Sequence, residues 1–272
     1  MDRRPGRTVR VAVTTHTADG ESRSDDRVVA EEPLEIRIAA AGLPAVRAWV
    51  TMRTPGHDFE LAAGCAVCEG LTTPSAIRTV AYCTDVDLSP EEELNVVTLH
   101  LDSQAAAAPA RHRAQSAGSS ACGVCGKDSV REALAVRTAS PWSGPRASAD
   151  VVRRLPEALR SQQKVFDQTG GVHAAALATH DGRILVARED VGRHNAVDKV
   201  VGARVLRGEP PAEACLVVSG RAGFELVQKA AAVGIGAMVA VGAPTSLSVQ
   251  LAEQAGMDLW GFTSPARVVR FC

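Results

Sequence analysis

The sequence has no excess of charge of either sign. Its 272 residues hold 30 lysines and arginines against 31 aspartates and glutamates. A chain with balanced charge creates no overall field that would attract a polyanion or an acidic membrane surface. We therefore expect neither a nucleic-acid partner nor a membrane partner.

The sequence also lacks long apolar runs. Residues 1–16 carry positive charge, but no apolar core of signal-peptide length follows, and no window approaches a membrane-spanning run. We expect a cytoplasmic protein, in which cysteines face a reducing pool and a disulfide framework is not expected. Any special role among the seven cysteines would then be catalytic or metal-binding. They are Cys65, Cys68, Cys83, Cys122, Cys125, Cys215 and Cys272.

The length and the local patterns predict two domains with distinct segments before and between them. Residues 1–27 are polar and aperiodic, which predicts a disordered or loosely attached tail. Residues 28–101 predict a smaller α+β domain, with strands near 34–39, 46–52 and 94–101 and a helix within 54–71. Residues 102–146 are small, polar and basic at first, and predict a mobile segment that carries a C-x-x-C loop. Residues 147–272 predict a layered α/β domain.

The expected elements of this α/β domain alternate along the chain. A helical stretch over 147–167 is predicted to bend or restart at Pro156. A hairpin follows around the turn at Asp181 and Gly182, and apolar strands begin at Cys215, Ala237 and Met257. Helices of suitable length start near Gly223 and Pro244.

Three strand-to-helix turns of this domain have the composition of anion-binding sites. They span 188–199, 219–230 and 242–249, and each places small residues, hydroxyls or arginines before a helix. Helix N-termini favour anions, and Arg193 or Arg221 could grip phosphate oxygens bidentately. One such turn alone is best explained as a tight turn, but three at one predicted sheet edge indicate a nucleotide-like ligand. His173 and His194 flank this edge, and each taken alone is better explained as a framework histidine.

The chain contains two C-x-x-C pairs. Cys65 and Cys68 share an apolar helical face with Leu61, which favours a place in the core over a shared zinc site. Cys122 and Cys125 lie among glycines and small residues, near an expected helix N-terminus and a lysine, where the thiol pKa should fall toward neutrality. A zinc deaminase would need an H-x-E or C-x-E element, which the chain lacks. A thioredoxin-like dithiol stays possible, but a reactive thiol on a mobile loop suits the transfer of a group.

Several segments together resemble the formate dehydrogenase accessory sulfurtransferases, the FdhD family. The resemblance runs from about Val28 onward, and the segment REDVGRHNAVDK is far more specific than a bare C-x-x-C. The matching segments, in order, are TPGHDFELAAG, SSACGVCGK, TGGVHAAAL, REDVGRHNAVDKVVG, SGRAGFELVQKA, GAPTSLSVQLA and GFTSPAR.

The resemblance implies a sulfurtransferase of the carrier type. Such a protein accepts persulfide sulfur from a cysteine desulfurase and passes it to a molybdenum or tungsten bis(molybdopterin guanine dinucleotide) cofactor, which formate dehydrogenase needs for activity. It also implies a homodimer and a cytidine-deaminase-like second domain that has no metal of its own. Cys122 is then the expected persulfide carrier, and Cys125 would assist or resolve.

The resemblance and the phosphate-friendly turns together give one set of candidate cofactor-binding residues. The set is Phe262, Thr263, Ser264, Pro265, Ala266, Arg267, Arg193, His194, Ser219, Arg221 and Thr245. Aromatic residues are few, which leaves no obvious platform for stacking guanine, and Phe262, Phe224 and Trp260 are candidates for that role.

The chain departs from the family pattern at several of these positions. Ser264 and Pro265 stand where the family usually has Arg-Gly, and Gly223 stands where it usually has Ser. Two other hypotheses stay open. One is a cofactor-binding chaperone that holds and inserts the guanine dinucleotide without persulfide chemistry. The other is a zinc-stabilised module that uses all four C-x-x-C thiols.

Overall fold

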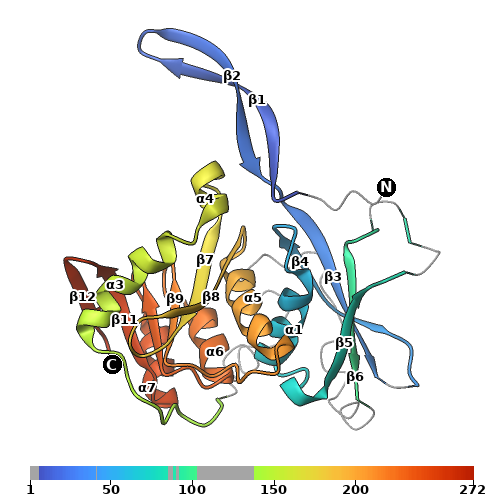
Figure 1. Cartoon of the computed structure of the whole chain (residues 1–272), viewed down its shortest axis with the longest axis vertical. Helices are drawn as coiled ribbons and strands as arrows, with labels where there is room; N and C mark the ends of the chain where they lie inside the picture. The colour runs from blue at the N-terminus through green and yellow to red at the C-terminus, as the bar shows by residue number, and fades with distance from the viewer. Residues whose placement is uncertain (1–5, 41, 85–87, 90–91, 103–137) are drawn as a thin grey trace.

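The computed structural model describes residues 6–40, 42–84, 88–89, 92–102 and 138–272. These residues form a mixed α/β structure with two large sheets and a separate hairpin (Figure 1). Within the described residues, no helix is long and apolar enough to cross a membrane.

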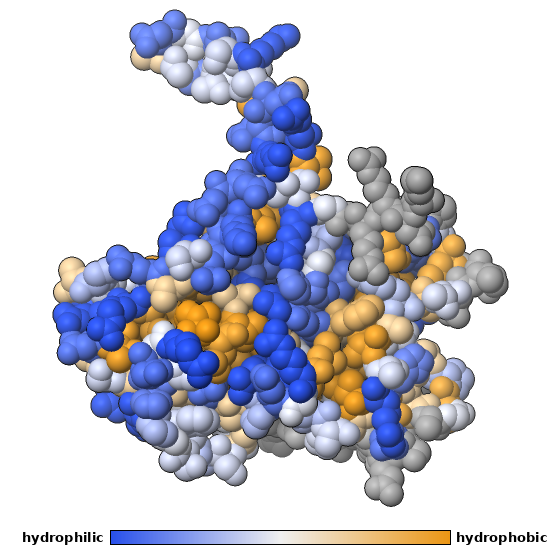
Figure 2. Space-filling view, viewed as in Figure 1, coloured by the Kyte–Doolittle hydropathy of each residue, from blue (hydrophilic) through white to orange (hydrophobic). Residues whose placement is uncertain are grey.

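The hairpin consists of β1 (Thr8–Thr17) and β2 (Gly20–Val29), paired antiparallel along their whole length. It projects from the body of the protein, and its surface is mainly hydrophilic (Figures 1 and 2). Residues 1–27 were expected to form a disordered or loosely attached tail, and the expectation of disorder was wrong for residues 8–27. The reason is that β-branched residues alternate along β1 and favour a strand, even though few of its side chains are buried.

The first large sheet has the strand order β4-β3-β6-β5. Its strands are β3 (Glu32–Ala40), β4 (Val46–Arg53), β5 (Ile77–Tyr82) and β6 (Val96–Leu101). β3 and β6 run parallel, and the outer strands pair antiparallel to them. The prediction of strands at β3, β4 and β6 is confirmed, whereas β5, which follows a short 3-10 helix (Pro74–Ala76), was missed.

The second large sheet has the order β12-β11-β10-β9-β7-β8. Its strands are β7 (His173–Ala178), β8 (Ile184–Asp190), β9 (Cys215–Val218), β10 (Ala237–Ala240), β11 (Asp258–Ser264) and β12 (Arg267–Arg270). The predicted hairpin is confirmed as β7–β8, and the three predicted apolar strands are confirmed as β9, β10 and β11. β12 was missed, since its four residues are too short to show a period.

Helices cover both faces of the second sheet. α3 (Ala149–Arg160) buries Val152, Leu155 and Leu159 against one face. The other face carries α5 (Arg193–Leu206), α6 (Phe224–Ala232) and α7 (Ser246–Ala255), whose apolar side chains form the largest core. The helical stretch was predicted to bend or restart at Pro156, and a restart at that residue is wrong. Pro156 lies inside α3, and the chain restarts as α4 (Lys164–Thr169) beyond Arg160.

Helix α1 (Asp58–Cys68) lies between the two sheets (Figure 1). It contributes to two cores, because Cys65 packs with the first sheet and Cys68 packs with α5 and α6. The prediction that both thiols are core residues is confirmed, but they do not share one face. α1 crosses α5 at two glycines. A Cβ on Gly64 would lie 1.8 Å from the carbonyl oxygen of Asp198, and one on Gly202 would lie 1.8 Å from that of Glu60.

Candidate ligand pocket at the edge of the second sheet

The strand directions bring the three predicted turns to one edge. β9, β10 and β11 are parallel, and β8 runs the same way because both β8 and β9 pair antiparallel to β7. The carboxyl ends of β8, β9, β10 and β11 therefore meet at the edge where β7 begins. The predicted convergence is confirmed, and this is the edge at which α/β sheets commonly bind ligands.

A pocket of about 710 Å³ lies at this edge. It combines the edge of the sheet with a wall formed by α3, α4 and the segment after α4. From the wall come Pro156, Glu157, Leu159, Arg160, Gln163, Phe166, Gly170, Gly171 and Val172; from the edge of the sheet come His173, Val191, Ser219, Val241, Thr263, Ser264 and Pro265. This volume is in the range of cavities that hold cofactors and drug-sized ligands.

Thr263 is the polar group of this pocket that the protein leaves unsatisfied. The residue is 2% exposed, and its Oγ1 has no hydrogen-bond partner among the described residues. A buried hydroxyl without a partner costs roughly 1–3 kcal/mol. Thr263 lines the pocket, so its hydroxyl is a candidate hydrogen-bond partner for a bound ligand.

Ser219 and His173 stand on neighbouring strands beside Thr263. The Ser219 Oγ accepts a hydrogen bond from the backbone N–H of Ala174 at 2.9 Å, which ties the end of β9 to the start of β7. His173 is half-buried at the first position of β7. Burial and the positive charge of Arg193 lower its pKa, although Asp190 acts in the opposite direction.

Helix α4 forms part of the pocket wall, and a residue of β8 fixes its N-terminus. Glu189 of β8 accepts hydrogen bonds from the backbone N–H groups of Val165 (2.9 Å) and Phe166 (2.8 Å), and so caps the N-terminus of this short helix. The guanidinium of Arg160 lies 4.8 Å from the centroid of the Phe166 ring. Arg160 and Phe166 both line the pocket, and neither was singled out from the sequence. α3 and α4 carry no motif, and only their packing on the sheet brings these two side chains to the pocket.

The pocket gathers four of the candidate cofactor-binding residues. These are Ser219, Thr263, Ser264 and Pro265. The C-terminal stretch is thus only partly at the pocket. Phe262 is 44% exposed in a left-handed conformation (φ 50°), beside Phe271 and below the guanidinium of Arg267.

The remaining candidates lie outside the pocket lining. Thr245 caps α7 by accepting from the backbone N–H of Ser248, and His194 is buried within α5. Arg193 begins α5, and Arg221 is exposed after β9. Ala266 is exposed in the turn between β11 and β12, next to Arg267. The stacking candidates Phe224 and Trp260 are not among the lining residues either, so the aromatic ring at this pocket is that of Phe166.

The specific segment 188–199 builds the joint between the two halves of the chain. Lys199 Nζ lies 2.6 Å from Asp190 Oδ2 and donates to the backbone carbonyl of Thr54 at 2.9 Å. Asp190 also accepts from the backbone N–H of Thr54 and from Asn195 Nδ2. Burial lowers the pKa of Lys199, while the carboxylate of Asp190 opposes that shift.

A second buried ion pair lies deeper along the same joint. Lys229 Nζ lies 2.9 Å from Asp198 Oδ1 and 2.8 Å from Glu69 Oε1. Burial would lower the Lys229 pKa, but the two carboxylates outweigh it and raise that pKa, whereas burial raises the pKa of Asp198 to about 6. Burial also raises the pKa values of Cys65 and Cys68, so these thiols stay protonated and unreactive.

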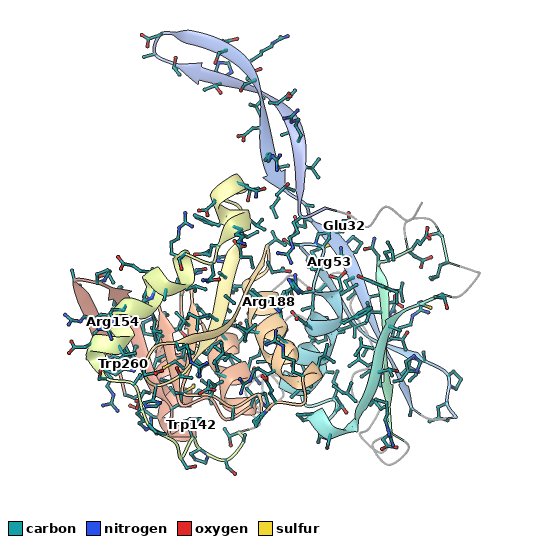
Figure 3. The ribbon with its side chains drawn as sticks, viewed as in Figure 1. Glu32, Arg53, Trp142, Arg154, Arg188 and Trp260 are labelled. Carbon is teal, nitrogen blue, oxygen red and sulfur yellow. The ribbon has the colours of Figure 1, made fainter. Side chains whose placement is uncertain are left out.

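A smaller pocket of about 380 Å³ lies at the N-terminus of α1, between the halves. Arg188 holds Glu60 there with two hydrogen bonds, and His57 Nδ1 lies 3.1 Å from the same carboxylate. Nearby, the fully buried Arg53 pairs with Asp58 and Glu32 (Figure 3). Burial works against the charge of Glu60, but the hydrogen bonds from Arg188 and His57 outweigh it and lower the pKa of Glu60 to about 2.

Cys122 and Cys125, the predicted sulfur-carrying residues, lie outside the described residues. Among the described cysteines, Cys215 is buried and Cys272 is partly buried. Burial raises the pKa of both thiols, to about 12 for Cys215. Neither thiol is poised as a thiolate.

Comparison with known proteins identifies the family. The model of the FdhD/NarQ family matches residues 29–272. The chain belongs to the FdhD/NarQ family. This FdhD/NarQ chain is 45% identical to a sulfur carrier protein FdhD of Corynebacterium efficiens, over 92% of this chain and 90% of the relative. A sulfur carrier protein FdhD of Thermoplasma volcanium is 37% identical, over 88% of this chain and 85% of that protein.

The fold is also found in a crystal structure. A protein from Desulfotalea psychrophila, described as a formate dehydrogenase accessory protein, superposes with a TM-score of 0.74. The two chains are 23% identical, and the likeness covers 98% of this chain and 97% of the other. At this identity the comparison establishes a shared fold.

Proposed function

We propose that this FdhD/NarQ protein is a sulfur carrier of the sulfurtransferase type that serves formate dehydrogenase. It accepts persulfide sulfur from a cysteine desulfurase on Cys122 and delivers it to a molybdenum or tungsten bis(molybdopterin guanine dinucleotide) cofactor. The cofactor is the cargo of the protein, and the guanine dinucleotide occupies the pocket at the edge of the second sheet. Family membership and the relatives named as sulfur carriers support this proposal.

The observation that carries the cofactor part of the proposal is the buried, unpartnered Oγ1 of Thr263. Thr263 lines a pocket of about 710 Å³, large enough for a nucleotide, and belongs to the stretch from Phe262 to Arg267 that resembles the cofactor-binding stretch of the family. Ser264 and Pro265 replace the usual Arg-Gly there, so the charge that meets the phosphates must come from elsewhere. Arg160 is the one arginine among the described residues that line the pocket, and we assign it that task.

The sulfur-loading step is a thiol–persulfide exchange. The Cys122 thiolate attacks the terminal sulfur of the donor persulfide, a new S–S bond forms to Cys122, and the donor leaves as a thiolate. Cys122 then carries S–SH, and no electrons are gained or lost overall. Cys125 assists or resolves this persulfide.

The same proposal includes the setting of the reaction. The protein acts as a homodimer in the cytoplasm, and its second sheet with its helices is of the cytidine-deaminase type, without a metal of its own. An antiparallel pair followed by parallel strands, with helices on both faces, is compatible with that assignment.

Intact-protein mass spectrometry after incubation with a cysteine desulfurase and cysteine tests the sulfur step. We expect a reducible gain of sulfur in the wild type that is lost in Cys122→Ala. Cys272→Ala is the matched control, because burial raises the pKa of that thiol and its removal should leave loading unchanged. A wild type that never gains sulfur would overturn sulfur transfer and favour a chaperone that only holds and inserts the cofactor.

A further inference from the structure

The hairpin of β1 and β2 ends in an edge strand with no strand beside it in the described part of the chain. The two strands form a sheet of their own, which projects from the body of the protein (Figure 1). Every residue of β2 from Gly20 to Val28 is exposed. A two-stranded hairpin is only marginally stable in water, and a third strand on the open edge of β2 would stabilise it.

Two arginines of β2 have no acid opposite them on their own hairpin. In the register of the two strands, Arg23 lies opposite Thr14, and Arg27 lies opposite Arg10. Like charges directly opposite each other destabilise a strand pair. Arg27 donates to the side chain of Gln168 at 3.2 Å, but a neutral amide does not offset its charge. The two arginines therefore favour an acidic neighbour on the open side of β2.

β2 carries such acids itself, in an order that is complementary to its own reverse. Residues 21–27 read Glu-Ser-Arg-Ser-Asp-Asp-Arg. When two copies of β2 pair antiparallel about Ser24, Arg23 lies opposite the partner's Asp25. Arg27 then lies opposite the partner's Glu21, and two-fold symmetry repeats both pairs. Opposite charges directly across an antiparallel pair stabilise it.

The neighbouring registers bring like charges together. A shift by two residues is the smallest one that keeps the same side chains on the same face. In one direction it places Arg23 opposite itself and Glu21 opposite Asp25. In the other direction it places Asp25 opposite itself and Arg23 opposite Arg27. Parallel pairing in register would place each charge opposite its own copy. The charges of β2 thus admit the register about Ser24 and oppose these alternatives.

We propose that the open edge of β2 is the surface on which two copies of this chain pair. The two hairpins then form one antiparallel sheet in the order β1-β2-β2-β1, with the two-fold axis at Ser24. The inference rests on the homodimer of the proposed function and names the surface that forms it. The match to the family model begins at residue 29, so the hairpin lies before the matched region.

A cysteine cross-link at the axis tests the register. Residues directly opposite in an antiparallel pair have Cα atoms about 4.5–5.5 Å apart, which is within reach of a disulfide. We expect Ser24→Cys to become a covalent dimer under mild oxidation on a non-reducing gel. Ser22→Cys is the matched control, because it is exposed on the same face of β2 but would lie roughly 14 Å from its own copy. Ser22→Cys and the wild type should stay uncross-linked. Equal cross-linking of both variants, or none in Ser24→Cys, would overturn this register.

Charge reversal, followed by sedimentation equilibrium, tests the pairing without a cross-link. Glu21→Arg places two arginines opposite each other at both ends of the strand pair, so we expect about tenfold weaker dimerisation. The double variant Glu21→Arg and Arg27→Glu exchanges the two signs and should return to within about threefold of the wild type.

The possible failures are distinguishable. A Glu21→Arg protein that dimerises as tightly as the wild type would overturn this surface and leave the homodimer intact. A wild type that is monomeric at every concentration would overturn the homodimer and the pairing of β2 together. Sulfur loading at Cys122 is measured separately and would remain testable in either case.

Discussion

Buried polar groups have protein partners at the joint between the two halves of the chain. At the pocket on the edge of the second sheet, a buried polar group lacks one in the described part of the chain. In the joint, Lys199 and Lys229 are each matched by carboxylates within hydrogen-bonding distance. In the pocket, the Oγ1 of Thr263 is buried without a partner among the described residues. A protein gains stability by satisfying the first kind of group and retains the second kind for a ligand. Substitutions in the two regions should therefore have opposite effects.

The largest effect is expected where α1 crosses α5. Gly202→Ala places a methyl group 1.8 Å from a backbone carbonyl that cannot move without its helix. We expect a loss of about 3 kcal/mol or more in the free energy of unfolding, or a failure to fold, because overpacking a rigid contact is costly. Urea titration against Gly220→Ala, whose new methyl group meets only ordinary contacts, measures the difference. Equal stability of the two variants would show that the helices can separate at little cost.

The next effect comes from breaking a buried ion pair in the joint. Lys199→Met leaves Asp190 charged, fully buried and without its cation, which we expect to cost about 3–5 kcal/mol. Arg78→Met is the control, because the Arg78–Asp102 pair is exposed and its loss should cost less than about 1 kcal/mol. Urea unfolding midpoints of the two variants give the comparison. Similar small losses in both would mean that the joint is wetter than its burial indicates.

A pH dependence is expected from Glu60. Its pKa is lowered from 4.5 to about 2 in the folded protein, so it stabilises the fold fully above pH 4.5 and this contribution is lost as the pH falls toward 2. Glu60→Gln should cost about 1–3 kcal/mol near neutral pH, because it leaves Arg188 without its carboxylate. The difference in free energy of unfolding between wild type and variant should become smaller as the pH falls from 4.5 toward 2. Urea titrations at pH 4.5 and near pH 2 measure this difference. The same difference in free energy of unfolding at both pH values would contradict the role of the ionised carboxylate.

Sequence reasoning found the pocket edge but not the whole pocket. Ser219 could be predicted because it follows an apolar strand at this edge of the sheet. Thr263, which lies near the end of β11, could be predicted only because its segment resembles the cofactor-binding stretch of the family. Arg160 and Phe166 could not, since their place depends on how α3 and α4 pack on the sheet, and that packing leaves no local pattern. The segment 188–199 has the composition of a phosphate site because small residues and arginines before a helix favour anions. Its side chains Asp190, Asn195 and Lys199 instead bond to each other and to residues 51–54, a long-range contact that no periodicity shows.

The smallest effect on the free energy of unfolding is expected in the pocket, where a substitution should stabilise the protein instead of destabilising it. Thr263→Val keeps the shape of the side chain and removes the unpartnered hydroxyl, so the ligand-free protein should gain about 1 kcal/mol in the free energy of unfolding. The same substitution should weaken GDP binding by about tenfold, because the ligand loses its hydrogen-bond partner. Ser248→Ala is the matched control. Its hydroxyl is bonded to Thr245 in the cap of α7, and its removal should lower stability without changing GDP affinity. A Thr263→Val protein that is less stable than the wild type would show that the hydroxyl already has a hydrogen-bond partner in solution. The pocket would then not differ from the joint in leaving a buried polar group unsatisfied.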